Sequence, residues 1–245
     1  MVEEVTTAAS TDFRFDIPLY TQAEAARAVG VSSTTLANWA KGYVHQQPGR
    51  PAVTGAPVVT CLRSADPGGP TIPFVGLSEA LVLAAVRRSG VPLQRVRPAL
   101  AVLSKDLGVD HALASKRLYS DGAEILFDYA ERSSDPDAPL VRQLVVVRNQ
   151  QRVFTEAVEQ YLQLIEYASD GYARLVRLPG YSEAEVVADP VRSFGQPIFS
   201  RGGAKVTDVL ERFWAGDDLD TLVDEFGVPR SELEDVVRVA SRRAA

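Results

Sequence analysis

Residues 20–42 read YTQAEAARAVGVSSTTLANWAKG, two short helical segments that meet at a glycine. Thr21 and Glu24 have the spacing of a capping box, which predicts that the first helix begins here. Gly30 predicts its end, because glycine readily adopts the left-handed conformation at a helix C-terminus. One of the serines at positions 32 and 33 is the predicted cap of the second helix, which ends at the next glycine. The stretch therefore predicts two helices joined by a tight turn.

The apolar residues of this stretch have the spacing that lets two crossed helices pack across a glycine turn. They are Ala25, Ala26, Val29, Val31, Leu36 and Trp39. The pattern is typical of a helix-turn-helix, whose second helix usually enters the major groove of DNA. An ordinary αα-hairpin is the alternative. DNA binding is favoured because the alanines are small where the helices approach, and because the outer face of the second helix is polar. That face carries Ser33, Thr34, Thr35, Asn38 and Lys41, which are able to reach base edges or phosphates.

Two extended pieces follow within residues 43–60, on either side of a tip rich in proline and glycine. This pattern predicts a β-hairpin with a long loop. A hairpin directly after a recognition helix occupies the position of the wing in winged helix-turn-helix proteins. His45, Gln47 and Arg50 are then candidates for contacts with the DNA backbone. A plain surface loop is the alternative reading of each of these residues.

Helices are predicted over residues 76–90 and 91–108, with Pro98 expected to kink or divide the second. The order helix-turn-helix, wing, helix, helix resembles transcription regulators of the MerR type, from Tyr20 to about Leu107. The chain differs from that family in its long, proline-rich wing and in lacking a long C-terminal dimerisation helix. Four arginines in this region are candidate phosphate contacts, and a solvated helix face explains them equally well: Arg87, Arg88, Arg95 and Arg97.

The middle of the chain predicts further pieces of a mixed core and no recognisable chemistry. Residues 118–129 are expected to form a strand, or two strands around a turn at Asp121-Gly122. Residues 144–147 predict a buried strand, and residues 154–168 a helix with one apolar face. An extended segment is expected over residues 171–179.

The chain changes character at about residue 189, where an extended segment and a glycine turn precede three predicted helices. These helices cover residues 207–215, 219–226 and 231–242, with Ser231 and Glu234 as a second capping box. The apolar spacing around Gly227 repeats that around Gly30, which predicts a second helix-turn-helix. Eight carboxylates that would repel phosphate flank it, so we expect it to contact protein. They are Asp217, Asp218, Asp220, Asp224, Glu225, Glu232, Glu234 and Asp235.

Short motifs of this C-terminal block resemble a small domain that recurs in antitoxins of bacterial toxin–antitoxin pairs. They are Gly195-Gln196-Pro197-Ile198, Gly203-Ala204-Lys205-Val206, Val209-Leu210, Ala215-Gly216 and Val237-Arg238. The chain has Ala204-Lys205 where that family has Thr-Arg, and one extra residue near Gly202. Together with the MerR-like front, the whole resembles a VapB-type antitoxin that is larger than its usual relatives. The resemblance implies a protein that silences a PIN-domain ribonuclease toxin and represses their shared operon as a dimer.

PIN-type ribonucleases are acidic at a metal site, so an inserted arginine is one way to block them. The arginines on flexible or terminal segments of the C-terminal block are the candidates: Arg192, Arg201, Arg242 and Arg243. The apolar segment 194–199 is an alternative contact, and it is equally able to pair two subunits.

The predicted fold class is mainly α with minor β (α+β). A flexible tail is expected at residues 1–15, a winged helix-turn-helix domain at 16–110, a mixed middle at 111–180 and a three-helix domain at 181–245. Within residues 13–19, apolar residues alternate with polar ones or proline. This alternation predicts a short strand or an arm docked on the first helix.

The charge distribution limits which end of the chain is able to meet DNA. The net charge is −6, and residues 181–245 hold eight basic and thirteen acidic side chains. Residues 1–58 are nearly balanced, with four basic and five acidic side chains. Because phosphate contacts supply much of the affinity for DNA, the N-terminal part is the better DNA ligand.

Other features argue against an enzyme, a membrane protein and a secreted protein. The longest apolar runs are too short to span a bilayer, and Met1 is followed by acidic and polar residues. A single cysteine, Cys61, excludes an internal disulfide and fits the reducing cytoplasm. With two histidines and one cysteine, no Cys/His metal cluster is expected. There is no phosphate-binding glycine loop either, so we predict neither cofactor nor catalysis.

Three functions remain open at this point. The first is the antitoxin, in which the N-terminal helix-turn-helix reads operator DNA and other surfaces bind the toxin. The second is a MerR-like regulator without a toxin partner, in which the central strands form an effector pocket. The third is an adaptor that uses both helix pairs for protein contacts. A homodimer is expected for DNA binding, because one recognition helix with few cations gives little affinity.

Overall fold

The computed structural model describes residues 11–46, 49, 52–148 and 151–244, with side chains up to residue 242. Its α-helices, in chain order, are α1 (Gln22–Val29), α2 (Ser33–Lys41), α3 (Phe74–Arg88), α4 (Leu93–Leu107), α5 (Lys116–Arg132), α6 (Ala138–Val141), α7 (Glu156–Leu162), α8 (Val206–Trp214), α9 (Leu219–Phe226) and α10 (Arg230–Ala244). Short 3₁₀ turns are η1 (Ala112–Ala114), η2 (Arg142–Leu144) and η3 (Ser193–Gly195). The fold is mainly α with minor β, as the sequence predicted.

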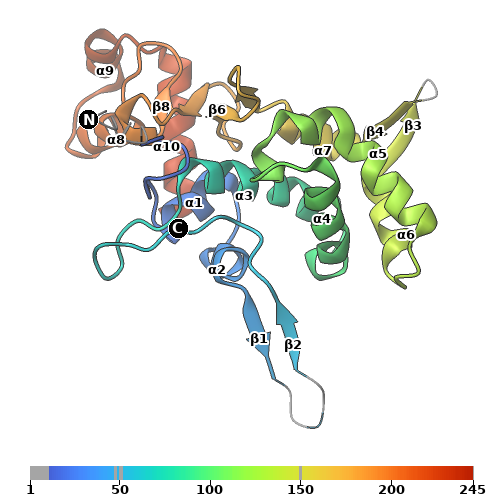
Figure 1. Ribbon diagram of the computed structural model, residues 1–245. Helices are drawn as coiled ribbons and strands as arrows, with labels where there is room; N and C mark the ends of the chain where they lie inside the picture. The colour runs from blue at the N-terminus through green and yellow to red at the C-terminus, as the bar shows by residue number, and fades with distance from the viewer. Residues whose placement is uncertain (1–10, 47–48, 50–51, 149–150, 245) are drawn as a thin grey trace, which may run out of the picture.

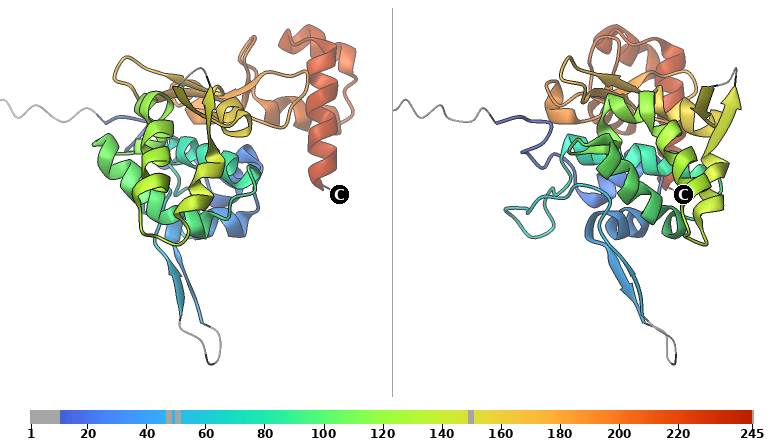
Figure 2. Two further views of the ribbon diagram at one scale, coloured as in Figure 1. Left: turned by 90° about the vertical axis from the view of Figure 1, so that its right-hand side faces the viewer. Right: turned by 45° about the vertical axis from the view of Figure 1, so that its right-hand side comes forward.

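The strands form two hairpins and one small sheet. β1 (Tyr43–His45) pairs with β2 (Val53–Gly55), and β3 (Val145–Arg148) pairs with β4 (Gln151–Phe154), both antiparallel. The sheet has the order β5-β6-β7-β8, from β5 (Ile165–Tyr167), β6 (Ala173–Arg177), β7 (Val186–Ala188) and β8 (Ile198–Phe199). Figure 1 shows the β1–β2 hairpin projecting away from the body below α2, whereas α8, α9 and β8 lie at the opposite end. The views in Figure 2 agree on this projection.

The opening helix pair forms as its capping residues predict. Thr21 and Glu24 make both bonds of a capping box at the start of α1, and Gly30 is left-handed with φ 74°. Ser32, one of the two predicted caps, accepts the backbone N–H of Thr35 at the start of α2. The residues buried between the helices are Ala25, Ala26, Val29, Leu36 and Trp39, at 0–4% exposure. The small alanines let α1 and α2 approach closely, which is the packing that a helix-turn-helix needs.

Pro98 does not divide α4, which runs without interruption from Leu93 to Leu107. The expectation of a division was wrong because Pro98 and Gln94 both lie on the exposed side of the helix. There, water is able to satisfy the backbone carbonyl of Gln94, which proline cannot bond. The opposite face buries Val96, Ala99 and Leu103, and this packing keeps the helix whole.

The predicted strand at residues 118–129 is wrong, because this segment is the middle of α5. Leu118, Gly122 and Leu126 recur at the helical spacing and are buried on one face. Gly122 is a packing residue rather than a turn residue. A Cβ atom at this position would lie 2.9 Å from Leu118 Cδ1 and 3.1 Å from Phe154 Cζ. The Asp121-Gly122 pair was therefore wrongly interpreted as a turn. Glycine is needed at position 122 because the helix packs closely against Phe154, which lies far away in the sequence.

Two other predictions for the middle region need correction. The helix expected over residues 154–168 covers only Glu156–Leu162, and residues 165–167 form β5 instead. The strand expected to be buried, β3, is buried only at Val145, and Val147 is 63% exposed. β3 belongs to a two-stranded hairpin, so only its first residue reaches the core. The extended segment expected at 171–179 is confirmed by β6.

The C-terminal helices follow the prediction closely, with one exception. Gly227 is left-handed, with φ 64°, and joins α9 to α10 as Gly30 joins α1 to α2. The second capping box is wrong, because α10 begins at Arg230, one residue before Ser231. Glu234 instead accepts a hydrogen bond from Arg230 Nε at 2.9 Å. Pro229 precedes the helix, which starts at Arg230. Ser231 therefore lies inside the first turn of α10 and is not its cap.

The arm before α1 pairs with the segment that leads into α3 through an antiparallel bridge between Tyr20 and Ile72. The backbone N–H of Tyr20 donates to Ile72 O at 3.0 Å, and Val75 N donates to Arg14 O at 2.9 Å. Arg14 also pairs with Asp12 and with Asp170 in the turn between β5 and β6. Residues 12–15, the end of the predicted tail, are thus held by hydrogen bonds, and residues 1–10 lie outside the described part.

Most of the buried apolar residues form one core that extends from Tyr20 to Val236. Leu175, Val187 and Ile198 form a second, small cluster in the β5–β8 sheet. Asp235, at 1% exposure, connects α10 to this core through its carboxylate. Its Oδ2 accepts the backbone N–H groups of Ser182, Glu183 and Ala184 at 2.6, 2.9 and 3.2 Å. Burial alone raises the pKa of Asp235, but the three backbone donors and Arg238 outweigh burial, so the pKa lies below its usual value.

We predict that Asp235→Ala lowers the free energy of unfolding at pH 7 by about 3 kcal/mol, because it leaves three backbone donors without an acceptor. The folded-state pKa is lowered, so the contribution is present above the unfolded pKa of about 3.9. It is lost as the pH falls through the folded-state value. Urea unfolding of both proteins between pH 7 and pH 3 measures this difference. Asp224→Ala, on the exposed side of α9, is the control. Equal losses in the two variants would contradict the anchoring role.

Candidate nucleic-acid interface

The outer face of α2 is open to solvent. Ser33, Thr34, Asn38 and Lys41 are exposed, and Thr35 is half-buried. The capping bond of Ser32 sets the start of this helix, and its buried face packs on α1. The five side chains predicted to meet DNA therefore share one accessible helix face.

Arg87, at the end of α3, reaches the first turn of α2. Its Nη1 donates to Thr35 Oγ1 at 2.7 Å, and the same hydroxyl lies 2.8 Å from Ser32 Oγ. Thr35, Asn38, Arg87, Gln94 and Arg97 line a single groove between α2 and the start of α4. The sequence marked these arginines only as possible phosphate contacts. Their place beside the recognition helix depends on how α3 packs, which residue spacing does not reveal.

The hairpin is fixed to the end of α2 through the segment that follows β2. The backbone N–H groups of Val58 and Val59 both donate to Trp39 O, at 2.8 and 3.1 Å. Arg97 donates to Ala56 O and lies over the ring of Tyr43, with 5.4 Å from its guanidinium carbon to the ring centroid. The β1–β2 hairpin and α2 are therefore held together by these contacts.

The buried carboxylate of Glu79 in α3 binds Thr60, the residue that follows Val59. Glu79, 5% exposed, accepts the backbone N–H of Thr60 at 2.6 Å and the Thr60 hydroxyl at 3.1 Å. His111 Nδ1 lies 3.1 Å from Glu79 Oε1. This hydrogen bond raises the pKa of His111 above its usual value, against the effect of partial burial. Sequence reasoning missed Glu79, since its partners are 19 and 32 residues away.

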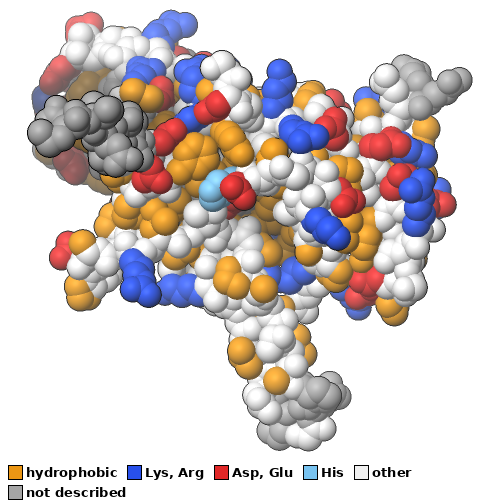
Figure 3. Space-filling model, viewed as in Figure 1, with side chains coloured by type: hydrophobic (Ala, Val, Ile, Leu, Met, Phe, Trp, Pro, Cys, Tyr) orange, Lys and Arg blue, Asp and Glu red, His pale blue; other side chains and the backbone are white. Residues whose placement is uncertain are grey.

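The described residues of the wing include no lysine or arginine. His45 is exposed on β1, whereas Gln47 and Arg50 lie outside the described residues. Figure 3 shows the projecting hairpin mainly in white and orange, with the cations located on the body above it. All four candidate arginines make contacts within the protein, Arg87 and Arg97 those given above. Arg88 lies over the ring of Tyr161, and Arg95 faces Asp137 at 3.9 Å.

The arginines predicted to meet a toxin fall into two groups. Arg192 lies in the β7–β8 loop (residues 189–197), and Arg201 lies in the β8–α8 loop (residues 200–205). A Cβ atom at Gly203 would lie 2.5 Å from Arg192 Nη2, so these two loops touch. Arg242 is exposed near the end of α10, and the side chain of Arg243 lies outside the described part. None of the ion pairs between described residues involves Arg192, Arg201 or Arg242.

The β7–β8 loop exposes apolar side chains on a strained backbone. Val191 is 84% exposed and Phe194 is 70% exposed. Ser193 and Phe194 have φ angles of 49° and 51°, which side chains other than glycine rarely adopt. Asp189 holds the loop, since its Oδ1 accepts Val191 N and its carbonyl accepts the N–H groups of Arg192 and Gly195. Strain of this kind is often found at sites of function.

Neither a metal-binding cluster nor a membrane-spanning helix is found among the described residues. No group of three or more His, Cys, Asp or Glu side chains is placed to hold a metal ion. Within the same ranges, none of the helices combines the length and apolar character needed to cross a membrane.

Residues 18–100 match a family model described as "Putative DNA-binding HTH domain". The match begins before α1 and ends within α4, so it includes every residue predicted to meet DNA. Over 228 residues, the chain is 48% identical to a Mycobacterium tuberculosis protein named "Putative antitoxin VapB45", covering 92% of this chain and 95% of that protein. The X-ray crystal structure of Rv2018 from Mycobacterium tuberculosis has a TM-score of 0.81 and 45% identity, covering 91% of this chain and 99% of that chain.

The family follows from the 48% identity to one relative over nearly the full length of both chains. The structural similarity extends over the same length. The chain therefore belongs to the family of VapB-type antitoxins, and it carries a DNA-binding helix-turn-helix domain in its N-terminal part.

Proposed function

We propose that the protein neutralises a PIN-domain ribonuclease toxin by direct binding and represses its own operon as a homodimer. The relationship to a protein named as an antitoxin supports the first role, and the helix-turn-helix domain supports the second. The observation that carries the combination is the separation of two candidate surfaces. In Figure 1, α2 and the wing lie at one end, and the elements around β8 and α8 lie at the other. DNA and toxin are then able to bind one chain at the same time.

On the DNA side, Asn38 is the side chain best suited to read a base. It is exposed in the middle of α2 and lines the groove that also holds Arg87 and Arg97. An asparagine side chain is able to donate to and accept from the major-groove edge of adenine. Ser33, Thr34 and Lys41 lie on the same face and supply phosphate contacts. His45 extends this contact along β1, and Arg50, which lies outside the described residues, is a further candidate from the sequence. Two copies of the chain on a palindromic site supply the affinity that one helix lacks.

We predict that Asn38→Ala weakens binding to the promoter upstream of the gene by about tenfold to a hundredfold, because one base contact is lost. Lys41→Gln should weaken binding to all DNA sequences and reduce the salt dependence of the affinity by about one charge. Titration with fluorescent promoter DNA at several salt concentrations measures both effects. Gln143→Ala, exposed on η2 away from α2, is the control. An unchanged affinity for Asn38→Ala would show that α2 does not read the operator.

On the toxin side, the β7–β8 loop combines a cation with exposed apolar groups. Arg192 stands between Val191 and Phe194, and no described residue pairs with its guanidinium. Arginine and aromatic side chains are the usual centres of protein interfaces. An arginine in this place is able to enter an acidic metal site while its neighbours exclude water. Arg201 contributes from the adjacent loop, and Arg242 and Arg243 form a second possible contact at the end of α10.

We predict that Phe194→Ala and Arg192→Gln each weaken binding to the PIN-domain protein encoded beside the gene by about tenfold or more. Co-purification, titration and recovery of ribonuclease activity in the mixture measure the effect. Val147→Ala, at a side chain 63% exposed on β3, is the matched control and should have no effect. Full inhibition by both loop variants, with loss of inhibition in Arg242→Gln, would move the toxin contact to α10. Promoter binding without binding to any PIN-domain protein would favour the MerR-like regulator instead.

A further inference from the structure

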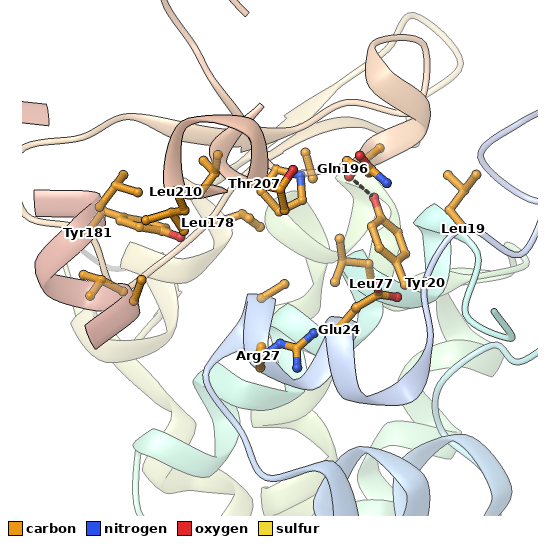
Figure 4. A pocket seen from close by; sticks show the side chains of 18 of the residues that line it. Leu19, Tyr20, Glu24, Arg27, Leu77, Leu178, Tyr181, Gln196, Thr207 and Leu210 are labelled. Atoms are coloured by element: carbon orange, nitrogen blue, oxygen red, sulfur yellow. Dashed lines mark hydrogen bonds between the residues drawn. The ribbon is translucent and has the colours of Figure 1, made fainter. Parts of the chain in front are cut away.

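A cavity lies between the helix-turn-helix and the C-terminal helices. None of its lining residues belongs to α2, and residues 195–197 at the end of the β7–β8 loop form part of its wall. Its volume is about 320 Å³, within the range of small-molecule sites in proteins. The walls come from α1, α8 and α10, and Figure 4 shows α1 on one side and the C-terminal helices on the other. Most of its lining side chains are apolar, such as Ala28, Leu77, Leu210, Val236 and Val239. Such walls favour an apolar ligand body.

Two of the polar groups in this cavity are already used within the protein. The hydroxyl of Tyr20 donates to Gly195 O at 2.7 Å, which Figure 4 marks with a dashed line. Glu24 belongs to the capping box of α1, where its Oε2 accepts the Thr21 backbone N–H at 2.8 Å. The Tyr20 proton and Glu24 Oε2 are therefore already engaged, whereas Glu24 Oε1 has no hydrogen-bond partner among the described residues.

Arg27 differs from these two. It lines the cavity from the last turn of α1, and Figure 4 shows its guanidinium beside the open space. Within the described ranges, its guanidinium takes part in no hydrogen bond or ion pair. Glu24 and Arg27 are the charged lining residues, and the capping interaction holds one oxygen of Glu24. The site thus offers one unpaired cation beside an apolar chamber.

We infer that this cavity binds a small amphiphile, with its apolar body between α1 and α8 and its single carboxylate on Arg27. A guanidinium recognises a carboxylate with two parallel hydrogen bonds, which fixes the orientation of the ligand. The bound molecule would touch the DNA-binding front and the C-terminal helices together. The inference goes beyond the proposed function, because neither toxin nor operator DNA is needed for it.

The test uses the full chain and two probes with the same tail and opposite charges, decanoate and decyltrimethylammonium, below their micelle concentrations. Calorimetry should show one decanoate per chain and much weaker binding of the cation. Arg27→Gln should weaken decanoate binding by about tenfold or more, because it removes a charge-assisted hydrogen bond. Ala28→Leu should weaken it as well, because the longer side chain occupies the cavity. The emission of Trp214, 60% exposed at the rim, should change on binding.

Arg63→Gln is the matched control, since Arg63 is an exposed cation that does not line the cavity. Thermal unfolding of each variant confirms that it is folded before titration. Equal binding of the two probes, or an undiminished affinity of Arg27→Gln, would show apolar binding without recognition of the carboxylate and overturn the inference. No binding of decanoate to the folded wild-type chain would overturn it too. These outcomes leave the proposed function standing, because promoter and toxin binding are measured separately.

Discussion

The hydrogen bond from Tyr20 to Gly195 joins two parts of the chain that are 175 residues apart. The ring of Tyr20 is buried, at 4% exposure, and its backbone pairs with Ile72 immediately before α1 begins. A buried hydroxyl without a partner costs free energy, so the carbonyl of Gly195 is required where it stands. Burial, together with Asp189 and Glu24, raises the pKa of Tyr20 far above its usual value. The hydroxyl therefore remains a donor at any physiological pH.

This contact also explains the backbone of the loop that receives it. A Cβ atom at position 195 would lie 2.3 Å from the Tyr20 hydroxyl, so only glycine fits. Ser193 and Phe194 precede this glycine in the left-handed region, and the Phe194 side chain is exposed and lies beside the ring of Phe13 instead of in the core. The contact between Tyr20 and Gly195 thus fixes both the position of α1 and the conformation of the exposed apolar loop that we propose to bind the toxin. The loop and the cavity beside Arg27 both lie where the N-terminal helices meet the C-terminal part of the chain.

The sequence was informative where the cause of a structure is local. Capping residues and left-handed glycines predicted α1 and α2, because each signal acts within one helical turn. The apolar spacing around Gly227, another local signal, predicted the α9–α10 pair. The prediction failed at residues 118–129, because glycine is required at position 122 by close packing against Phe154 and not by a turn. In the candidate site, the exposed face of α2 was predictable from helical spacing. The bonds of Arg87 to Thr35 and of Glu79 to Thr60 were not, since they join elements whose packing no short pattern specifies.

Ion pairing explains how a chain of net charge −6 is able to offer cations to its partners. In the C-terminal helices, Arg212 pairs with Asp217 and Glu225, and Arg230 pairs with Asp220 and Glu234. These pairs contribute little to the stability of the fold, because they are exposed to solvent. They do engage both arginines with carboxylates of the same chain, so these arginines are not available to a partner. The described arginines without such a pair include Arg27, Arg192 and Arg242. Net charge is therefore a poor guide to recognition here, since binding depends on the cations that the fold leaves unpaired.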